Sequence, residues 1–429
     1  MMGLHFMGDV PFRRILLHGM VVDENGDKMS KVKANTIDPL DLIEGTDFER
    51  MVTKTLPGAP VEEALAKFRK AYPSTAQMGE GFPAYGGDAL RMTLCSYSPQ
   101  AKRIALSPKR IEGYRNFCNK IYNAVRYALG HIEGVVPADG PPAEPKLLVN
   151  RWILSRLAKA VDASTSGIDG FRLDEGSSAL YHFFWDELCD WFLEMSKPVF
   201  NGGSEAEQAE TRATLAHVIE TALRALHPYM PFITEELWQR IPRPAARPVS
   251  VALAPYPTRE DGRIDDRSER HMEVLTRAIT SARSARSEHG VASSARVPLT
   301  FRAADPELCD VLRAEARAIE FLVRTDGPPE VQAPSSERPR GTVLSVAGEV
   351  EVLVGLKGLV DAAKERERVE RSIKKVEKDL AVLKKRLDNP KFVDKAPPEV
   401  VAEARSQRAQ LTEQQARLQD ALALAAELA

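Results

Sequence analysis

Three lysines in one short stretch have the spacing to act together. Lys28, Lys31 and Lys33 lie between the turn-forming pair Asn25-Gly26 and a predicted helix start. A lysine ammonium group is a flexible point charge that can follow a phosphate as negative charge develops on it. A basic loop of this kind suits the stabilisation of a nucleotide's pyrophosphate while a carboxylate attacks the α-phosphorus. The tetrapeptide Lys-Met-Ser-Lys by itself is also compatible with a solvated surface turn.

The neighbouring residues predict the elements that would position this loop. Residues 15–22 (ILLHGMVV) form a short apolar run that is typical of a buried strand. After the loop, Asp38 is a good N-cap and Pro39 suits the first position of a helix. The sequence therefore predicts a strand, a tight turn, a basic loop and a helix, in that order.

The stretch 27–42, DKMSKVKANTIDPLDL, resembles the KMSKS signature loop of class I aminoacyl-tRNA synthetases and the helix that follows it. Two positions depart from the signature. Val32 stands where the last serine is usual, and Ala34 stands where glycine is common. Because glycine is the more permissive residue, we expect Ala34 to stiffen the loop. Both charges that the chemistry needs, Lys28 and Lys31, are present.

The resemblance implies roles for four residues of the loop. Lys28 and Lys31 would be catalytic and would bind the phosphates of ATP, with Lys31 as the stronger candidate. Met29 would anchor the loop by packing, and Ser30 would fix it by hydrogen bonding. The resemblance also implies Mg²⁺ as the companion of ATP in the full enzyme, and we assign no metal ligand in this chain.

The composition bounds the class of protein. With 429 residues, 43% of them hydrophobic and 28% charged, the chain is long enough for two to four domains with a sizeable core. The formal net charge of −2 creates no global basic field, so RNA binding would depend on local patches. No apolar run approaches the length of a membrane span, and no signal peptide is recognisable.

The cysteines indicate the compartment. They are far apart and form no Cys-x-x-Cys pair: Cys95, Cys118, Cys189 and Cys309. This spacing argues against a zinc site and against a disulfide framework. It fits a protein of the reducing cytoplasm.

The N-terminal region predicts an incomplete catalytic domain. A single strand at 15–22 cannot form a nucleotide-binding parallel sheet, because one strand alone buries nothing. We therefore expect residues 1–100 to be the C-terminal end of a Rossmann-type catalytic domain, and the chain to be the C-terminal part of a longer enzyme. By resemblance, the remaining part would carry the His-Ile-Gly-His signature. No His-x-Gly-His string occurs in this sequence.

Residues 44–87 alternate between loop and helix signals. A loop is predicted at 56–60, an amphipathic helix at 61–72 and a glycine-rich loop at 79–87. We interpret the region as a surface insertion and assign it no role.

An antiparallel helical bundle is predicted over residues 101–290. Apolar residues recur at helical spacing after Asp88 and in four further segments: 109–129, 179–197, 212–226 and 271–287. Thr234 is the expected N-cap of one more helix, after two prolines. We interpret His182 and His227 as structural, because no partner nucleophile accompanies either of them.

Three strings in the bundle resemble the valyl-tRNA synthetase family: EGYRNFCNK, FWDELCDWFLEMSKP and LHPYMPFITEELW. The resemblance implies an anticodon-binding domain. Arg115, Asn116, Asn119 and Lys120 leave a polar, cationic flank on the helix at 109–129 that is able to bind tRNA phosphates and bases. A solvated helix face is the alternative interpretation. Arg277, Arg283 and Arg286 add positive charge near the end of the bundle.

Two further regions follow the bundle. Residues 291–358 predict a small α/β piece, with strands at 297–302, 342–346 and 349–354 and a helix at 306–324. Residues 359–429 predict an antiparallel coiled-coil hairpin with a first arm of about 40 Å. Its first seam has a heptad spacing and its second is weaker: Val369, Ile373, Val376, Leu380, Leu383 and Leu387, then Val400, Ala404, Leu411, Leu418 and Leu422.

The first arm of this hairpin is one-sidedly basic. Lys374, Lys378 and Lys385 are candidate contacts to RNA phosphates, because each neutralised phosphate releases a counterion. The arm is rich in other cations as well: Lys375, Lys384, Arg386 and Lys391. LDNPKFVDKAPPEVVAEAR resembles the C-terminal arm of the valyl-tRNA synthetase family, which implies contact with tRNA. A solvated charged face is the alternative.

The sequence therefore predicts a mainly α protein: the end of a Rossmann-type domain, a helical bundle, a small α/β piece and a coiled-coil hairpin. The resemblance implies part of an ATP-dependent ligase that attaches valine to tRNA(Val), with ATP, valine and tRNA(Val) as partners, no membrane and a monomeric state. The alternative is a tRNA-binding module without catalysis. A purely structural coiled-coil protein leaves the basic loop unexplained. We expect the chain by itself to be inactive in aminoacylation.

Overall fold

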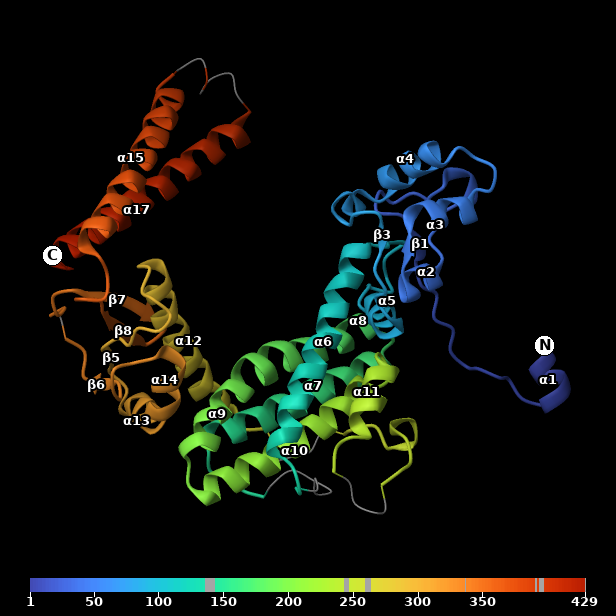
Figure 1. The fold of residues 1–429 in the computed structure, drawn as a ribbon, viewed down its shortest axis with the longest axis horizontal. Helices are drawn as coiled ribbons and strands as arrows, with labels where there is room; N and C mark the ends of the chain where they lie inside the picture. The colour runs from blue at the N-terminus through green and yellow to red at the C-terminus, as the bar shows by residue number, and fades with distance from the viewer. Residues whose placement is uncertain are drawn as a thin grey trace. The chain divides into compact units, whose positions relative to one another are not determined.

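The computed structural model describes residues 1–135, 143–242, 247–258, 264–335, 337–389, 392 and 397–428. The predicted mainly helical class is confirmed, and the chain divides into two compact units, residues 1–269 and 270–429 (Figure 1). No helix among the described residues is long and apolar enough to cross a membrane. Pro390, Lys391, Lys395, Ala396 and the centre of the turn region 134–145 lie outside the described residues.

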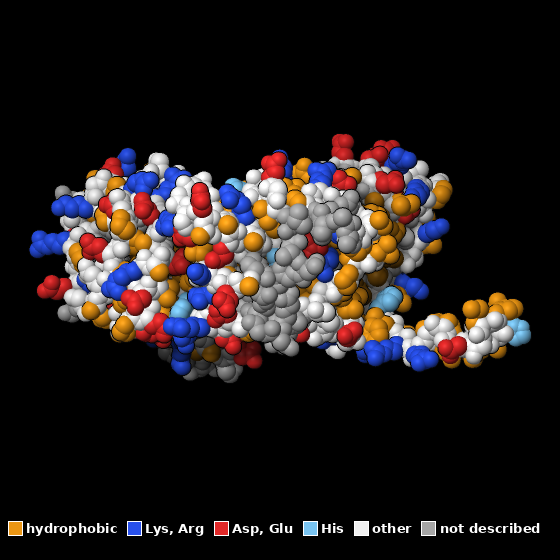
Figure 2. Space-filling model, turned by 90° about the horizontal axis from the view of Figure 1, so that it is seen from below, with side chains coloured by type: hydrophobic (Ala, Val, Ile, Leu, Met, Phe, Trp, Pro, Cys, Tyr) orange, Lys and Arg blue, Asp and Glu red, His pale blue; other side chains and the backbone are white. Residues whose placement is uncertain are grey.

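The first unit begins with a segment that is largely exposed to solvent. The predicted strand at 15–22 is too long, since only β1 (Met20–Val22) pairs, in parallel, with β4 (Arg103–Ala105). Before β1, α1 (Met2–Met7) and the residues after it leave large apolar side chains exposed: Leu4, Phe6, Met7, Val10, Phe12, Ile15, Leu16 and Leu17. Figure 2 shows hydrophobic side chains in orange on the segment that extends from the molecule. Two parallel strands hold few hydrogen bonds, which explains the short ladder.

Residues 44–87 do not form a surface insertion, so that interpretation is wrong. They fold as short elements: β2 (Thr46–Asp47), α3 (Phe48–Thr55), α4 (Val61–Ala71), η2 (Pro73–Gln77) and β3 (Gly81–Phe82). Phe48, Phe68, Tyr72 and Phe82 are buried and join one apolar cluster with Ala34 of the basic loop. β2 and β3 pair at Gly81, where a Cβ would lie 2.2 Å from the Thr46 carbonyl oxygen. The region therefore supports the loop.

The helical bundle of the first unit contains the helices predicted at 109–129, 179–197 and 212–226, whereas the helix predicted at 271–287 lies in the second unit. The bundle contains α5 (Gly87–Cys95), α6 (Pro108–His131), α7 (Leu148–Asp169), α8 (Leu173–His182), the π-helical η3 (Phe183–Phe192), α9 (Leu193–Gly202), α10 (Glu205–Leu226) and α11 (Pro231–Trp238). The short η4 (Val251–Leu253) precedes α12 (Asp266–Glu288), which continues into the second unit. The bundle core is fully buried at Phe117, Ile153 and Leu223.

The segment predicted as one helix at 179–197 differs in its winding. Its middle is η3, in which hydrogen bonds span five residues instead of four. Phe184, Leu188 and Phe192 are spaced by four residues, and all three are fully buried. The wider turn keeps this apolar row on the buried face.

Thr234 is not the N-cap that the sequence predicted. It lies inside α11, and its hydroxyl donates to the Met230 carbonyl at 2.7 Å. The first turn of α11 is capped instead by Asp88 of α5, whose carboxylate accepts from the backbone N–H groups of Phe232 (3.1 Å) and Ile233 (2.7 Å). Because Asp88 is 144 residues away in the chain, local sequence could not identify this cap.

The second unit contains a four-stranded sheet in the order β6-β5-β8-β7. Its strands are β5 (Leu299–Ala303), β6 (Glu330–Gln332), β7 (Thr342–Ala347) and β8 (Val350–Gly355). The predicted β7–β8 hairpin is confirmed, whereas β6 was missed and the predicted helix at 306–324 is two helices, α13 (Pro306–Ala314) and α14 (Ala316–Val323).

Two of the three arginines noted near the end of the bundle are structural. Arg286 is 7% exposed, and its guanidinium donates to carbonyl oxygens of Val323, Arg324 (3.1 Å) and Ala295 (2.8 Å). Arg283 donates to the Leu322 carbonyl at 3.1 Å. These cations satisfy the last carbonyl groups of α14.

The chain ends in the predicted antiparallel hairpin, with arms α15 (Ala362–Leu387) and α17 (Pro398–Leu428). Val369, Val376 and Leu383 of α15 are buried at the seam. Val401 and Ala404 are buried on α17. The heptad pattern thus predicted the hairpin and the apolar face of α15. On α17 the predicted seam is only partly right, because Ala404 is buried but Val401 is buried in place of Val400.

Candidate phosphate-binding loop and RNA-binding surfaces

A backbone bridge fixes the start of the basic loop, and a short 3₁₀-turn and a capped helix follow it. An isolated antiparallel bridge joins Lys28 to Val22 of β1. The 3₁₀-turn η1 (Lys31–Lys33) then begins at Ser30, whose hydroxyl accepts from the Lys33 N–H at 3.3 Å. The loop leads into α2 (Pro39–Glu44), where Asp38 accepts from the Leu40 N–H at 3.0 Å and Pro39 is the first helical residue, as predicted.

The side chains of this loop separate into an outer and an inner set. Lys28, Lys31 and Lys33 are exposed, and Lys33 lies 3.9 Å from Asp27. Met29 packs against the apolar cluster, and Ala34 is 1% exposed within it. The ammonium groups of Lys28 and Lys31 are therefore open to solvent, where a phosphate could approach them.

Two buried polar residues form the inner framework of the loop, and the sequence interpretation missed both. Asn35 and Asp23 are each 2% exposed. The Asn35 side-chain oxygen accepts from the Ser30 N–H at 2.8 Å, while its NH₂ group donates to the Lys28 carbonyl (3.3 Å) and to the Asp23 carboxylate (2.8 Å). The other Asp23 oxygen accepts from the N–H groups of Asn25 (3.1 Å) and Asp27 (2.8 Å).

The region at 44–87 supports this framework from behind. The Tyr72 hydroxyl donates to the Asn35 carbonyl oxygen at 2.9 Å. Burial raises the pKa of Tyr72, and the nearby carboxylates of Asp23 and Glu24 raise it further, so the hydroxyl stays a donor at neutral pH. Glu24 accepts from the Ser74 N–H (2.9 Å) and from the Ser107 hydroxyl (2.8 Å) at the start of α6.

The four candidate RNA contacts of α6 differ in their surroundings. Arg115, Asn116 and Asn119 are exposed. Lys120 instead pairs with Asp190 at 2.6 Å and lies 4.0 Å from the centroid of the Trp185 ring. A cation held in this way also ties α6 to η3.

The three candidate lysines of α15 share one face. Lys374, Lys378 and Lys385 are exposed, and at about 100° per residue they fall within about 40° of one another, opposite the buried seam. Within the described part of the chain, no ion pair neutralises these three lysines, whereas Arg366 pairs with Glu370 and Arg371 with Glu367, each at 2.8 Å. The stripe is therefore a local positive field on a chain with little net charge.

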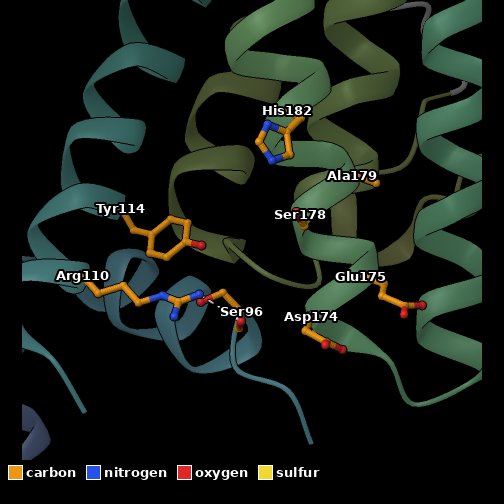
Figure 3. Close-up of a pocket in the computed structure, with 8 residues that line it drawn as sticks. All are labelled: Ser96, Arg110, Tyr114, Asp174, Glu175, Ser178, Ala179 and His182. Carbon is orange, nitrogen blue, oxygen red and sulfur yellow. Dashed lines mark hydrogen bonds between the residues drawn. The ribbon is translucent and has the colours of Figure 1, made fainter. Parts of the chain in front are cut away.

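A groove of about 490 Å³ between α6 and α8 does not bring a catalytic pair together (Figure 3). Arg110 on one side donates to the Ser96 carbonyl at 3.1 Å. On the other side, Asp174 pairs with Arg172 at 2.9 Å, and His182 contacts Asp186 at 2.8 Å. These charges are satisfied within the fold.

The remaining histidine and cysteine candidates are also structural in their contacts. His227 contacts the Thr234 hydroxyl at 2.8 Å, and burial lowers its pKa. Burial raises the pKa of Cys118 and of Cys189 to about 12, so neither thiol is ionised at neutral pH. The described residues contain no group of three or more His, Cys, Asp or Glu side chains that could hold a metal ion.

Comparison with known proteins accounts for both the loop and the basic hairpin. Residues 1–107 match the family model of class I tRNA synthetases for isoleucine, leucine, methionine and valine, and residues 150–301 match the anticodon-binding domain of tRNA ligases. The chain belongs to the class I aminoacyl-tRNA synthetases.

Within that class, residues 361–424 match the tRNA-binding arm of valyl-tRNA synthetases. The chain is 38% identical over 418 residues to the valine–tRNA ligase of Chromobacterium violaceum, covering 96% of this chain and 43% of that protein. It is 38% identical over 422 residues to the Laribacter hongkongensis valine–tRNA ligase, covering 97% of this chain and 44% of that protein. The chain therefore belongs to the valyl-tRNA synthetase family. It spans less than half the length of these relatives.

Proposed function

We propose that the chain supplies the ATP-phosphate loop, the anticodon-binding bundle and the tRNA-binding arm of a valine–tRNA ligase. In the first step, a valine carboxylate oxygen attacks the α-phosphorus of ATP, the bond to the bridging oxygen breaks and pyrophosphate leaves. Lys28 and Lys31 stabilise the charge that develops on the departing phosphates. A hydroxyl group of the tRNA terminus then attacks the carbonyl carbon of the adenylate, an ester bond forms and AMP leaves.

The observation that carries this proposal is the exposed pair Lys28 and Lys31 on a loop that is anchored by the buried Ala34 and Asn35 and by the packing of Met29. A free, flexible loop would lose much of its binding energy in ordering itself around the phosphates. A loop whose backbone is already ordered avoids that loss. Such preorganisation is what the stabilisation of a transition state requires.

In this proposal Mg²⁺ binds to ATP and not to the basic loop. The basic loop offers ammonium groups, which repel a cation, whereas Mg²⁺ prefers oxygen ligands. The residues of the loop therefore do not fit Mg²⁺ itself, and the ion would be held by the ATP phosphates and by groups outside the loop. The work of Lys28 and Lys31 is to bind and orient phosphate oxygens.

We propose that the loop works together with a polypeptide that carries more of the parallel sheet. β1 and β4 form a sheet of only two strands, and parallel sheets are normally covered on both faces. The segment before β1 exposes a row of large apolar side chains, which is typical of a surface that another element covers. The length of the relatives, more than twice that of the matched region, supports this requirement.

The RNA partner in the proposal is tRNA(Val). Arg115, Asn116 and Asn119 are exposed on α6, and the α15 stripe of Lys374, Lys378 and Lys385 offers three unpaired charges to phosphates. The protein would act as a monomer, because the coiled coil closes within one chain. All four cysteines are free thiols, which fits a cytoplasmic site of action.

A chimaera tests the function directly. The matched 418 residues of the Chromobacterium violaceum enzyme are replaced by this chain, and valine-dependent ATP–pyrophosphate exchange and charging of tRNA(Val) are measured. We expect both activities in the chimaera and neither in the chain alone. A folded chimaera that activates another amino acid, or none, would contradict the proposal.

A tRNA-binding module without catalysis is the second candidate. The matches to an anticodon-binding domain and to a tRNA-binding arm support it, because binding of tRNA needs no catalytic residue. It predicts salt-dependent binding of tRNA by the chain and no exchange activity in the chimaera.

A further inference from the structure

The side chain of Asn35 forms hydrogen bonds with two backbone groups of the basic loop. Its side-chain amide bonds to the backbone on both sides of Met29, at the Lys28 carbonyl (3.3 Å) and at the Ser30 N–H (2.8 Å). Met29 itself packs into the apolar cluster between these two bonds. The backbone from Lys28 to Ser30 is thus held at three consecutive residues, which leaves the lysine side chains on the outer surface.

The amide is in turn held by groups that do not belong to the loop. Asp23, which is 2% exposed, accepts from the Asn35 NH₂ group at 2.8 Å and also organises the turn after β1. The Tyr72 hydroxyl binds the Asn35 carbonyl oxygen at 2.9 Å. Asn35 is therefore connected to the sheet through Asp23 and to the 44–87 region through Tyr72.

Removal of this amide has effects that are specific to the loop. A buried carboxylate at Asp23 would lose a donor, and two backbone groups of the loop would lose their partners. The packing of Met29, the bridge between Lys28 and Val22 and the Ser30 cap would then be the restraints left on this backbone. The backbone that carries Lys28 and Lys31 would open toward solvent.

We propose that Asn35 is the positioning residue that holds the loop closed and so determines where Lys28 and Lys31 present their charges. The inference rests on the proposed function only for the identity of what the lysines bind. Tyr72 acts through Asn35 as a second support, which gives the 44–87 region a role in the loop's geometry.

Amide hydrogen exchange of the full chain tests the closed loop without any ligand. In Asn35→Ala, exchange of the peptide that covers 28–34 is expected to accelerate about tenfold or more, while α10 keeps its wild-type rate. Tyr72→Phe, which keeps the buried ring and loses one hydrogen bond, should give a smaller acceleration in the same peptide.

Asn25→Ala is the matched control. The Asn25 side chain donates to the Lys70 carbonyl at 2.7 Å and does not bond to the loop backbone. Its loop should exchange at the wild-type rate. An Asn35→Ala loop that exchanges as slowly as the wild type, with or without a change elsewhere, overturns the proposal.

Kinetics of the chimaera separate positioning from a merely structural role. Asn35→Ala should lower kcat for ATP–pyrophosphate exchange and raise KM for ATP about tenfold, while KM for valine is unchanged. Equal changes in both KM values, or none, would overturn the positioning role. If the wild-type chimaera has no activity, the proposed function fails, and the exchange experiment still decides whether Asn35 holds the loop closed.

Discussion

Two sets of lysines in this chain are exposed for different reasons. Lys28 and Lys31 stand on a loop whose backbone is bonded to Asn35, a buried polar residue. Lys374 and Lys378 stand on α15, whose buried side is an apolar seam. A loop that must meet the phosphates of one nucleotide needs a fixed backbone, whereas an arm that meets a long RNA backbone needs mainly charge at the right density.

The contrast also separates two ways of losing function. A change in the loop framework should alter the position of a charge without changing its amount. A change on the outer face of the arm should alter the amount of charge without changing its position. Substitutions in the loop and in the arm test this distinction.

Lys31→Ala in the chimaera should reduce valine-dependent ATP–pyrophosphate exchange by about 100-fold or more, because an electrostatic contact that strengthens in the transition state is lost. The substitution should leave folding intact, since Lys31 is exposed. Lys33→Ala is the matched control, because Lys33 lies near Asp27 and is not assigned to ATP. Similar losses in the two variants would show that general positive charge, and not the position of Lys31, matters.

Leu383→Ala should lower the free energy of unfolding of the hairpin by about 2–4 kcal/mol, because Leu383 is only 9% exposed at the seam. Amide exchange of α15 and α17 measures this change. Val382→Ala, at a neighbouring position that is 59% exposed, should change the stability by less than about 0.5 kcal/mol. If both variants behave alike, the hairpin is not held by its apolar seam.

The sequence predicted the arm more completely than the loop. Heptad spacing is a local signal, so the seam residues Val369, Val376 and Leu383 were recognisable before the structure. The loop framework depends on Asp23, Asn35 and Tyr72, which are brought together by folding. Asn35 lies within the stretch 27–42, but nothing in its local sequence indicates a contact with Asp23 or Tyr72.

Other misses have the same cause. Asp88 caps α11 from a distance in sequence, so the local N-cap rule selected Thr234 instead. The 44–87 region lacks a single long periodic element, and its aromatic residues reveal their role only where Phe48, Phe68 and Phe82 meet. Composition and spacing indicate elements, whereas contacts between distant segments decide which residues support a site.

Replacing Lys374, Lys378 and Lys385 by Gln should reduce the slope of log K against log salt for tRNA binding by about one for each lysine that contacts a phosphate, and so by about three at most. Binding of tRNA(Val) and of an anticodon-swapped version over a salt series measures it. Because contacts to phosphates do not depend on the base sequence, the loss of affinity should be equal for the two RNAs.

The double variant Arg366→Gln, Arg371→Gln is the control for this stripe, since both arginines already pair with glutamates on the same helix. Its salt slope should change less than that of the lysine variant. An unchanged slope in the lysine variant would mean that the arm is a solvated face and that RNA binding lies in the bundle.

Ala34→Gly is the smallest change and the most direct test of loop stiffness. Ala34 has φ 53° and ψ 29°, a left-handed conformation that costs a residue with a Cβ about 1–2 kcal/mol. Glycine removes that cost but loses a buried methyl group, worth about 0.8 kcal/mol, and gains freedom in the unfolded chain, worth about 0.5–1 kcal/mol. These effects nearly cancel, so the free energy of unfolding should change by less than about 1 kcal/mol. Exchange of the 28–34 peptide should nevertheless rise, but less than in Asn35→Ala, because the Asn35 hydrogen bonds are kept. If Ala34→Gly opens the loop as much as Asn35→Ala, backbone stiffness and not the buried amide holds the lysines in place.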